Sequence, residues 1–186
     1  MALELFLIRH AESEWNAAGR WQGHGDPPLS AKGREQAAEL ARAMQGVSID
    51  RLLCSDLRRA VQTAEALGAV LQLDPEPTAV LRELKVGRWT GLTGEEIRQS
   101  DGELLDAFNS EDPEVRPGGT DGETRSELRS RVREAIAKLA AEYPDGRIAL
   151  VVHLGVVRAL VPGSEPDHVE VTPLFVGDDR RGSAEG

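Results

Sequence analysis

Two histidines each follow a run of apolar residues, and an arginine precedes the first of them. Residues 5–8 (Leu-Phe-Leu-Ile) lead directly into Arg9 and His10, and residues 149–152 (Ala-Leu-Val-Val) lead into His153. Imidazole and guanidinium groups are N–H donors, and the planar arginine fork binds two oxygens of one oxyanion without losing its charge. These residue types indicate a binding site for a tetrahedral oxyanion such as phosphate.

A third apolar run places two more arginines close to the same site. Residues 49–55 are followed by Arg58 and Arg59. Open α/β sheets bind ligands beyond the carboxyl ends of their strands, so we expect one of these arginines to join the histidines. Two histidines could also begin a metal site, but zinc usually needs a third protein ligand and neighbouring arginines would repel the cation. The pattern therefore favours an anion.

Strands that alternate with helices must position these side chains. Near-continuous apolar runs predict buried strands, and apolar residues at helical spacing predict helices, the first of them capped by Ser30. Strands are predicted at residues 3–9 and 49–55 and in the run 147–155, and helices at 30–46, 56–71 and 123–143. Because parallel strands need crossover connections, this order predicts a three-layer α/β sandwich with a mostly parallel central sheet flanked by helices.

The remaining segments predict less regular structure. Residues 73–84 form an extended segment broken by prolines, and residues 91–110 suggest one or two short helices. Residues 169–179 suggest an edge strand interrupted by Pro173. The whole pattern fits a single domain at residues 1–178, followed by a disordered tail at 179–186.

Composition argues against some classes of binding partner and indicates a cellular location. The 186-residue chain has a formal net charge of -10, which argues against nucleic acid and anionic membranes as partners. Its single cysteine, Cys54, excludes an intramolecular disulfide and fits a reducing compartment. No apolar stretch approaches the roughly 20 residues of a membrane span, and the N-terminus lacks signal-peptide features. We therefore expect a cytoplasmic protein.

Four sequence blocks together resemble one family. RHAESEWN, SDLRRAVQTA, LRELKVGRWTGLT and VVHLGVVRAL occur in this order within residues 5–160. They resemble the motif blocks of the histidine phosphatase superfamily, also called phosphoglycerate mutase-like. A single R-H-x-E tetrapeptide would be weak support, whereas four blocks in order are specific.

The resemblance implies a covalent phosphohistidine mechanism that needs no metal or other cofactor. His10 matches the family's nucleophile, whose attacking nitrogen must be neutral; a backbone carbonyl that binds the other ring nitrogen would fix that tautomer. Arg9 and Arg59 match the phosphate-binding arginines, and His153 matches a histidine that donates to the phosphoryl group. The phosphate-binding role is assigned to Arg59 because the family pattern R-A-x-Q-T begins at this residue. We therefore expect Arg58 to be exposed to solvent.

Three further positions carry roles that the resemblance implies. Glu83 matches the group that protonates the leaving oxygen and then activates water. Asn16 and Gly23 match phosphate-contacting positions, through a side-chain amide and a backbone N–H respectively. Without the resemblance, a glutamate in this charged chain would be read as a surface residue and the other two as turn residues.

The chain departs from the family pattern near both histidines. Ala11 and Leu154 stand where glycines usually follow, and a positive φ at position 154 would strain a leucine. The helix expected near Val156 is ended by Pro162, earlier than in many relatives. One wall of the substrate pocket would then be absent or supplied by another subunit, and the C-terminal apolar residues permit a homodimer without requiring one.

The leading functional prediction is a phosphatase that acts on a small phosphorylated metabolite. Family mutases carry an E-R-H-Y-G stretch that binds phosphoglycerate and a bisphosphate cofactor, whereas this chain reads ELKVGRWTG. Water is therefore the favoured acceptor of the phosphoryl group. The alternatives are a cofactor-dependent phosphoglycerate mutase and a non-catalytic phosphate-binding module; the second is opposed by the intact pair of His10 and Glu83.

Overall fold

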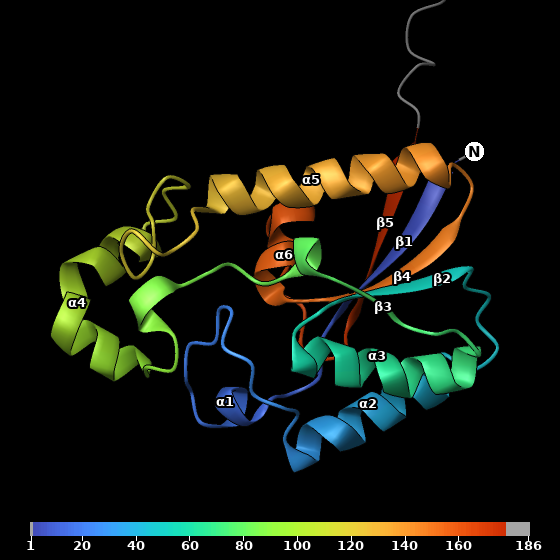
Figure 1. Cartoon of the computed structure of the whole chain (residues 1–186), viewed down its shortest axis with the longest axis horizontal. Coiled ribbons are helices and arrows are strands. Elements are labelled where there is room, and N and C mark those ends of the chain that lie inside the picture. The colour runs from blue at the N-terminus through green and yellow to red at the C-terminus, as the bar shows by residue number, and fades with distance from the viewer. Residues whose placement is uncertain (1, 178–186) are drawn as a thin grey trace, which may run out of the picture.

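A five-stranded sheet forms the centre of the computed structural model, which describes residues 2–177 (Figure 1). The tail predicted at residues 179–186 lies outside the described residues. The strands, in sheet order, are β3 (Glu76–Thr78), β2 (Arg51–Ser55), β4 (Arg147–Val152), β1 (Ala2–Arg9) and β5 (Val171–Gly177). The first four run parallel and β5 is antiparallel to β1, so the predicted mostly parallel sheet is confirmed.

Helices cover both faces of this sheet (Figure 1). They are α1 (Glu14–Ala17), α2 (Ala31–Ala43), α3 (Arg58–Leu71), α4 (Gly94–Asn109), α5 (Arg125–Glu142) and α6 (Leu154–Leu160), with 3-10 helices at Ala79–Leu81 and Gly87–Trp89. No helix in residues 2–177 is both long and apolar enough to cross a bilayer.

Side-chain alternation along β1 explains the three layers. Leu3, Leu5 and Leu7 belong to one buried cluster, which also contains the apolar residues of α5 and α6. Ile8 points to the opposite face and joins the buried residues of α2 and α3. Successive side chains of a strand point to opposite faces of the sheet. A central strand must therefore be apolar on both faces if helices are to pack against both. The predicted sandwich is confirmed.

Several local features differ from the prediction. α1 and the two 3-10 helices were not predicted, because each is only three or four residues long. β5 is not interrupted by Pro173, which pairs with Phe6 within the strand. An edge strand accepts proline because its outward N–H groups have no ladder partner to lose. α6 begins at Leu154, two residues before the expected Val156.

The N-terminus of α2 is docked against the chain that follows His10. Ser30 caps the helix by accepting a hydrogen bond from Gly33 N, and its own N–H donates to the Glu12 carbonyl at 2.9 Å. A Cβ atom at Gly33 would overlap that same carbonyl oxygen. Since backbone cannot give way as a flexible side chain can, glycine is required for this close approach.

We predict opposite effects for two glycine-to-alanine substitutions in helices. Gly33→Ala should lower the free energy of unfolding by roughly 1–3 kcal/mol, because overpacking against Glu12 outweighs the better helix propensity of alanine. Gly102→Ala is the matched control, since a Cβ there meets nothing within 4 Å. It should be neutral or stabilising by up to about 1 kcal/mol. Urea unfolding measures both, and equal effects would contradict the docking argument.

Candidate active site

The two strand-end histidines meet at the carboxyl edge of the sheet. β1 and β4 are neighbours, and His10 N donates to the Val152 carbonyl at 2.9 Å. The imidazole rings of His10 and His153 contact edge to face, with centroids 5.0 Å apart. Both residues are buried. Residues that are 143 positions apart therefore form one polar cluster at the end of an apolar sheet.

A single hydrogen bond fixes the tautomer of His10. Its Nδ1 lies 2.7 Å from the carbonyl oxygen of Ala11. A carbonyl can only accept, so Nδ1 carries the hydrogen and Nε2 presents a lone pair. Burial and the nearby charge of Arg59 hold the pKa of His10 well below its ordinary value. The ring is therefore neutral near pH 7 with a free basic nitrogen.

Arg59 is a fully buried cation that faces neutral acceptors. It is the second residue of α3, and its Nη1 and Nη2 donate to the carbonyls of Gly25 at 2.7 Å and Gly23 at 2.9 Å. Burial lowers its pKa to about 10. Arg58, the alternative left open by spacing, is exposed and does not line the cavity.

Thr63 ties Arg59 to the segment after His10. Its hydroxyl donates to the Arg59 carbonyl at 2.7 Å, one helical turn earlier, and accepts a hydrogen bond from Ala11 N at 3.1 Å. The loop that carries the His10 acceptor is thus bonded directly to the helix that carries the buried cation. This contact fixes the relative position of the two groups.

Arg9 is held by the segment before β5. Its Nη1 donates to the Pro166 carbonyl at 2.9 Å, and its Nη2 lies 3.3 Å from His168 Nε2. Burial lowers the pKa of Arg9, and the charges of Glu83 and Asp167 oppose that shift. The guanidinium keeps its charge, since the pKa of arginine starts above 12.

Unpaired buried nitrogens concentrate at this one place. Within residues 2–177, the buried side-chain nitrogen or oxygen atoms without a hydrogen-bond partner in the protein are Arg9 Nε, Arg59 Nε, His153 Nδ1 and His153 Nε2. Buried polar groups are normally hydrogen-bonded, because an unpaired one loses its water without compensation. A neutral His153 donates from one of its two nitrogens, so together with Arg9 Nε and Arg59 Nε it offers three unpaired N–H donors to the oxygens of an anion.

Glu83 is fixed next to His153 by backbone donors. Its Oε1 accepts from Leu84 N at 2.7 Å, and its Oε2 accepts from Gly155 N at 3.2 Å. A Cβ at Gly155 would overlap Glu83 Oε1, so a larger residue there would have to displace the carboxylate. Arg131 of α5 binds the main chain here, donating to the carbonyls of Arg82 at 2.8 Å and Glu83 at 3.1 Å.

Asn16 and Gly23 both line the cavity beside these groups. The side-chain oxygen of Asn16 accepts from the N–H and hydroxyl of Ser13, at 3.1 and 3.0 Å, in the capping box of α1. Gly23 has a φ of +46°, and a Cβ there would lie 2.7 Å from Val86 Cγ2. The position therefore needs glycine for both its backbone conformation and its surroundings.

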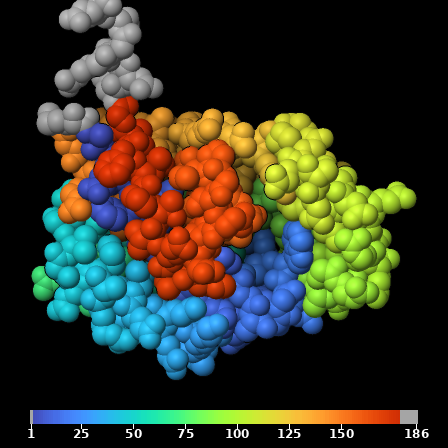
Figure 2. Space-filling view, turned by 180° about the vertical axis from the view of Figure 1, so that it is seen from behind, coloured from blue at the N-terminus to red at the C-terminus, as the bar shows by residue number. Residues whose placement is uncertain are grey.

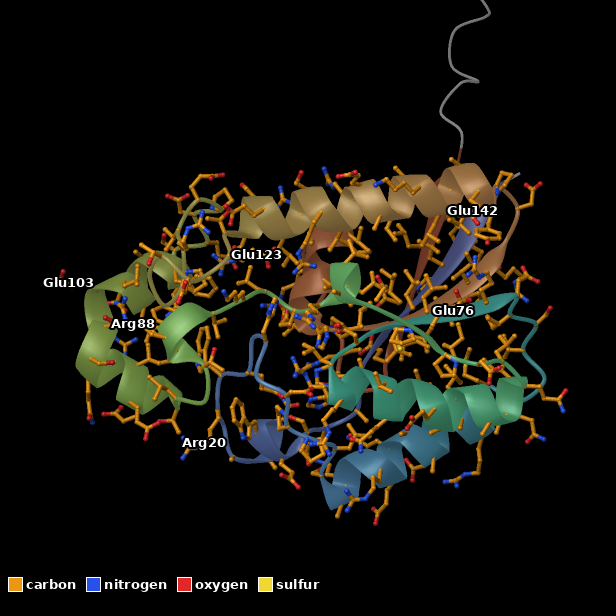
Figure 3. The ribbon with its side chains drawn as sticks, in the orientation of Figure 1. Arg20, Glu76, Arg88, Glu103, Glu123 and Glu142 are labelled. Atoms are coloured by element: carbon orange, nitrogen blue, oxygen red, sulfur yellow. The ribbon has the colours of Figure 1, made fainter. Side chains whose placement is uncertain are left out.

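A cavity of about 610 Å³ opens over this cluster. Its walls come from residues 15–23, from Phe108 and the start of α5, and from residues 154–165. Figure 2 shows the surface hollowed where the blue, yellow-green and orange-red parts of the chain meet. Arg20, labelled in Figure 3 on the loop after α1, belongs to the first of these walls.

The departures from the family pattern leave this site intact. Leu154 has no positive φ; it begins α6 and its side chain lines the cavity. Ala11 is buried and supplies the carbonyl that orients His10. The wall after α6 is not missing, because Pro162, Gly163 and Glu165 of this chain line that side of the cavity. A contribution from another subunit stays a prediction.

Three neighbours of the site were not found from sequence. His168 packs against His10 with ring centroids 5.9 Å apart, His24 Nε2 lies 2.9 Å from the Glu83 carbonyl, and Arg131 holds the main chain of Glu83. The chain contains only four histidines, and all four lie at this site. The small number of histidines could have indicated His24 and His168 as site residues. Nothing in the helical pattern distinguishes Arg131 from the other charged residues of its helix.

Metal ligands are not assembled around these groups. Among residues 2–177, no three side chains of histidine, cysteine, aspartate or glutamate are grouped so that they could hold a metal ion. The groups nearest the two histidines are cationic or neutral nitrogens with the carboxylate of Glu83, a set that suits an anion better than a cation.

Comparison with known proteins places this arrangement in a family. The family model of the histidine phosphatase superfamily (branch 1) matches residues 5–169. The adenosylcobalamin/alpha-ribazole phosphatase of Escherichia coli is 35% identical over 159 residues, which cover 86% of this chain and 77% of that protein. Phosphoglycerate mutase-like protein 4 of Arabidopsis thaliana is 34% identical over 188 residues, covering 94% and 81%.

A solved structure agrees in both fold and sequence. The mycobacterial glucosyl-3-phosphoglycerate phosphatase superposes with a TM-score of 0.83 at 31% identity, and the match covers 92% of each chain. The predicted fold is confirmed, as is the predicted class of phosphoric monoester hydrolase of the histidine phosphatase type. From the order of its motif blocks to the geometry of its strand-end histidines, this chain belongs to the histidine phosphatase superfamily.

Proposed function

We propose that this protein hydrolyses a small phosphate monoester through a covalent intermediate on His10, without a metal. The observation that supports this most directly is the set of unpaired buried nitrogens around a neutral, oriented imidazole. A pure binding site would need the donors but not the free lone pair on Nε2. The phosphatase names of similar proteins support the same reaction class.

In the first step, His10 Nε2 attacks phosphorus and a nitrogen–phosphorus bond forms as the ester oxygen–phosphorus bond breaks. The leaving oxygen takes a proton from the carboxyl group of Glu83, so an alcohol departs. Arg9, Arg59 and His153 donate to the three equatorial oxygens, over which the negative charge of the transferring group is spread. Asn16 and the backbone N–H of Gly23 complete the phosphate contacts.

In the second step, water attacks the phosphohistidine while Glu83 accepts the proton that water releases. The nitrogen–phosphorus bond breaks, its electron pair returns to His10 Nε2, and inorganic phosphate leaves. Glu83 is protonated again at the end, ready for the next substrate. Its two backbone donors and Gly155 hold the carboxylate beside the phosphoryl site in both steps.

A phosphoglycerate mutase is the second candidate, because several relatives are named phosphoglycerate mutase-like or probable phosphoglycerate mutase. The segment that follows Glu83 lacks the arginine, histidine and tyrosine of the mutase stretch E-R-H-Y-G. We therefore favour water as the acceptor. A cytoplasmic location, a small metabolite as substrate and a homodimer remain predictions from sequence.

His10→Ala should lower phosphate release at least about a thousandfold, because it removes the nucleophile. Phosphate would be measured from p-nitrophenyl phosphate and 3-phosphoglycerate in the presence of a chelator, with circular dichroism as the control for folding. Turnover retained by the variant would eliminate His10 as the nucleophile. Isomerisation to 2-phosphoglycerate that depends on 2,3-bisphosphoglycerate would instead establish the mutase.

Glu83→Gln should slow hydrolysis most for esters with poor leaving groups, by roughly a hundredfold or more, because alkoxides need a proton and p-nitrophenolate does not. Gly155→Ala should give the same dependence on leaving group, since it displaces the carboxylate without removing it. The measurement is kcat for a series of phosphate esters with graded leaving-group pKa. Uniform slowing across the series would count against a proton donor.

Stability should fall as the pH is lowered. The pKa values of His10 and His153 are held well below 6.5 by burial, so the unfolded chain takes up protons that the native state does not. Between about pH 7.5 and 5.5, each histidine should contribute about 1.4 kcal/mol of the loss. His10→Asn and His153→Asn should each make the dependence shallower by that amount in urea unfolding. Unchanged slopes would show that the histidines are not held neutral.

A further inference from the structure

Positive charge gathers in the cavity of an otherwise acidic chain. The formal net charge is -10, yet six arginines and only three glutamates line the cavity. The arginines are Arg9, Arg20, Arg59, Arg125, Arg129 and Arg158. Only Arg9 and Arg59 have a part in the phosphoryl transfer proposed above, which leaves four cations without an assigned role.

Two of these four are already engaged by carboxylates. Arg20 donates to the Gly91 carbonyl at 2.6 Å and lies 3.4 Å from Glu96, and Arg158 pairs with Glu165. Arg125 and Arg129 take part in none of the ion pairs within the described residues. They are therefore the arginines whose charge is available to a ligand.

Both lie on one face of α5, at positions that converge on the cavity. Arg125, Leu128 and Arg129 are spaced i, i+3 and i+4, and all three line it. Leu128 approaches the inner end, since its Cδ2 would lie 3.4 Å from a Cβ at Gly155, beside Glu83. The two arginines flank this leucine, so a ligand that extends from His10 along Leu128 would reach them.

Arg125 is built into the wall rather than free in solvent. Its guanidinium lies 3.9 Å from the centroid of the Phe108 ring, and its Nη1 donates to the Phe108 carbonyl at 3.0 Å. Burial lowers its pKa; the charge of Glu111 opposes this shift and that of Arg158 adds to it. A half-buried guanidinium with one neutral acceptor keeps several N–H donors for a further partner.

Resting on the proposed phosphatase function, we propose that Arg125, assisted by Arg129, binds a second anionic group of the substrate. The preferred substrates are then phosphate monoesters that also carry a carboxylate or a second phosphate. Arginine binds either oxyanion in the same bidentate manner. Leu128 and Phe108 provide the apolar surface between the two anionic ends.

The test compares matched substrates that differ only in the second anion. 3-Phosphoglycerate and glycerol 3-phosphate share a carbon skeleton and a phosphate, and fructose 1,6-bisphosphate and fructose 1-phosphate form a second pair. The readout is the ratio of kcat/KM within each pair. Arg125→Ala should lower the ratio in at least one pair by roughly ten- to a hundredfold, the range for a hydrogen bond between charged groups.

Arg133→Ala is the matched control, because it removes the same charge from an exposed position of the same helix outside the cavity. It should leave both ratios as in the unchanged protein. Arg129→Ala should give a smaller loss than Arg125→Ala, since Arg129 is exposed. The substrate pair whose kcat/KM ratio falls in Arg125→Ala identifies the second anion as a carboxylate or a phosphate.

Failure of this proposal is distinguishable from failure of the phosphatase. Hydrolysis that depends on His10, with ratios that Arg125→Ala does not change, overturns the second-anion site alone. If no ester is hydrolysed, titration calorimetry of 3-phosphoglycerate and glycerol 3-phosphate against the unchanged protein and Arg125→Ala still decides the matter. Equal binding of the two ligands by both proteins overturns the site, and selective loss of 3-phosphoglycerate affinity in the variant supports it.

Discussion

Buried positive charge without a directly bonded carboxylate, at the end of a buried sheet, is the constraint on which this structure depends. Arg59 is fully buried, yet its hydrogen bonds go to two carbonyls rather than to a carboxylate. Such an arrangement lowers stability unless an anion completes it, because a buried charge needs a compensating partner. Hydrogen bonds from Arg59 to the carbonyls of Gly23 and Gly25 hold its guanidinium in place despite that cost.

Much of the fold could be predicted because several short stretches of the sequence each indicate a strand or a helix. Near-continuous apolar strands and a capped helix at Ser30 identify an α/β sheet from composition and periodicity. The strand-end histidines could be predicted as neighbours for the same reason, since parallel strands share an edge. Short elements such as α1 could not, because four residues carry too little periodicity to separate a helix from a turn.

The rest of the site depends on contacts between segments that no local pattern encodes. Arg131 looks like one more charged residue on a solvent-facing helix, yet it binds the carbonyls of Val80, Arg82 and Glu83 and the carboxylate of Glu123. His168 lies beside Arg9 only because the chain returns along β1 as β5. No local pattern showed that the residues beyond α6 would line the cavity, yet Pro162, Gly163 and Glu165 do so.

α5 joins two parts of the site in one rigid body. Arg131 holds the main chain of Glu83, while Arg125 and Leu128, less than two turns earlier, form the cavity wall. A tilt of this helix would therefore move Glu83 and the cavity wall together. Homologous proteins could change the side chains at positions 125 and 129 to accept new substrates without disturbing the chemistry, provided that Arg131 stays in place. α5 thus carries side chains of the cavity wall at positions 125 and 129 and, at Arg131, a residue that supports the main chain of Glu83.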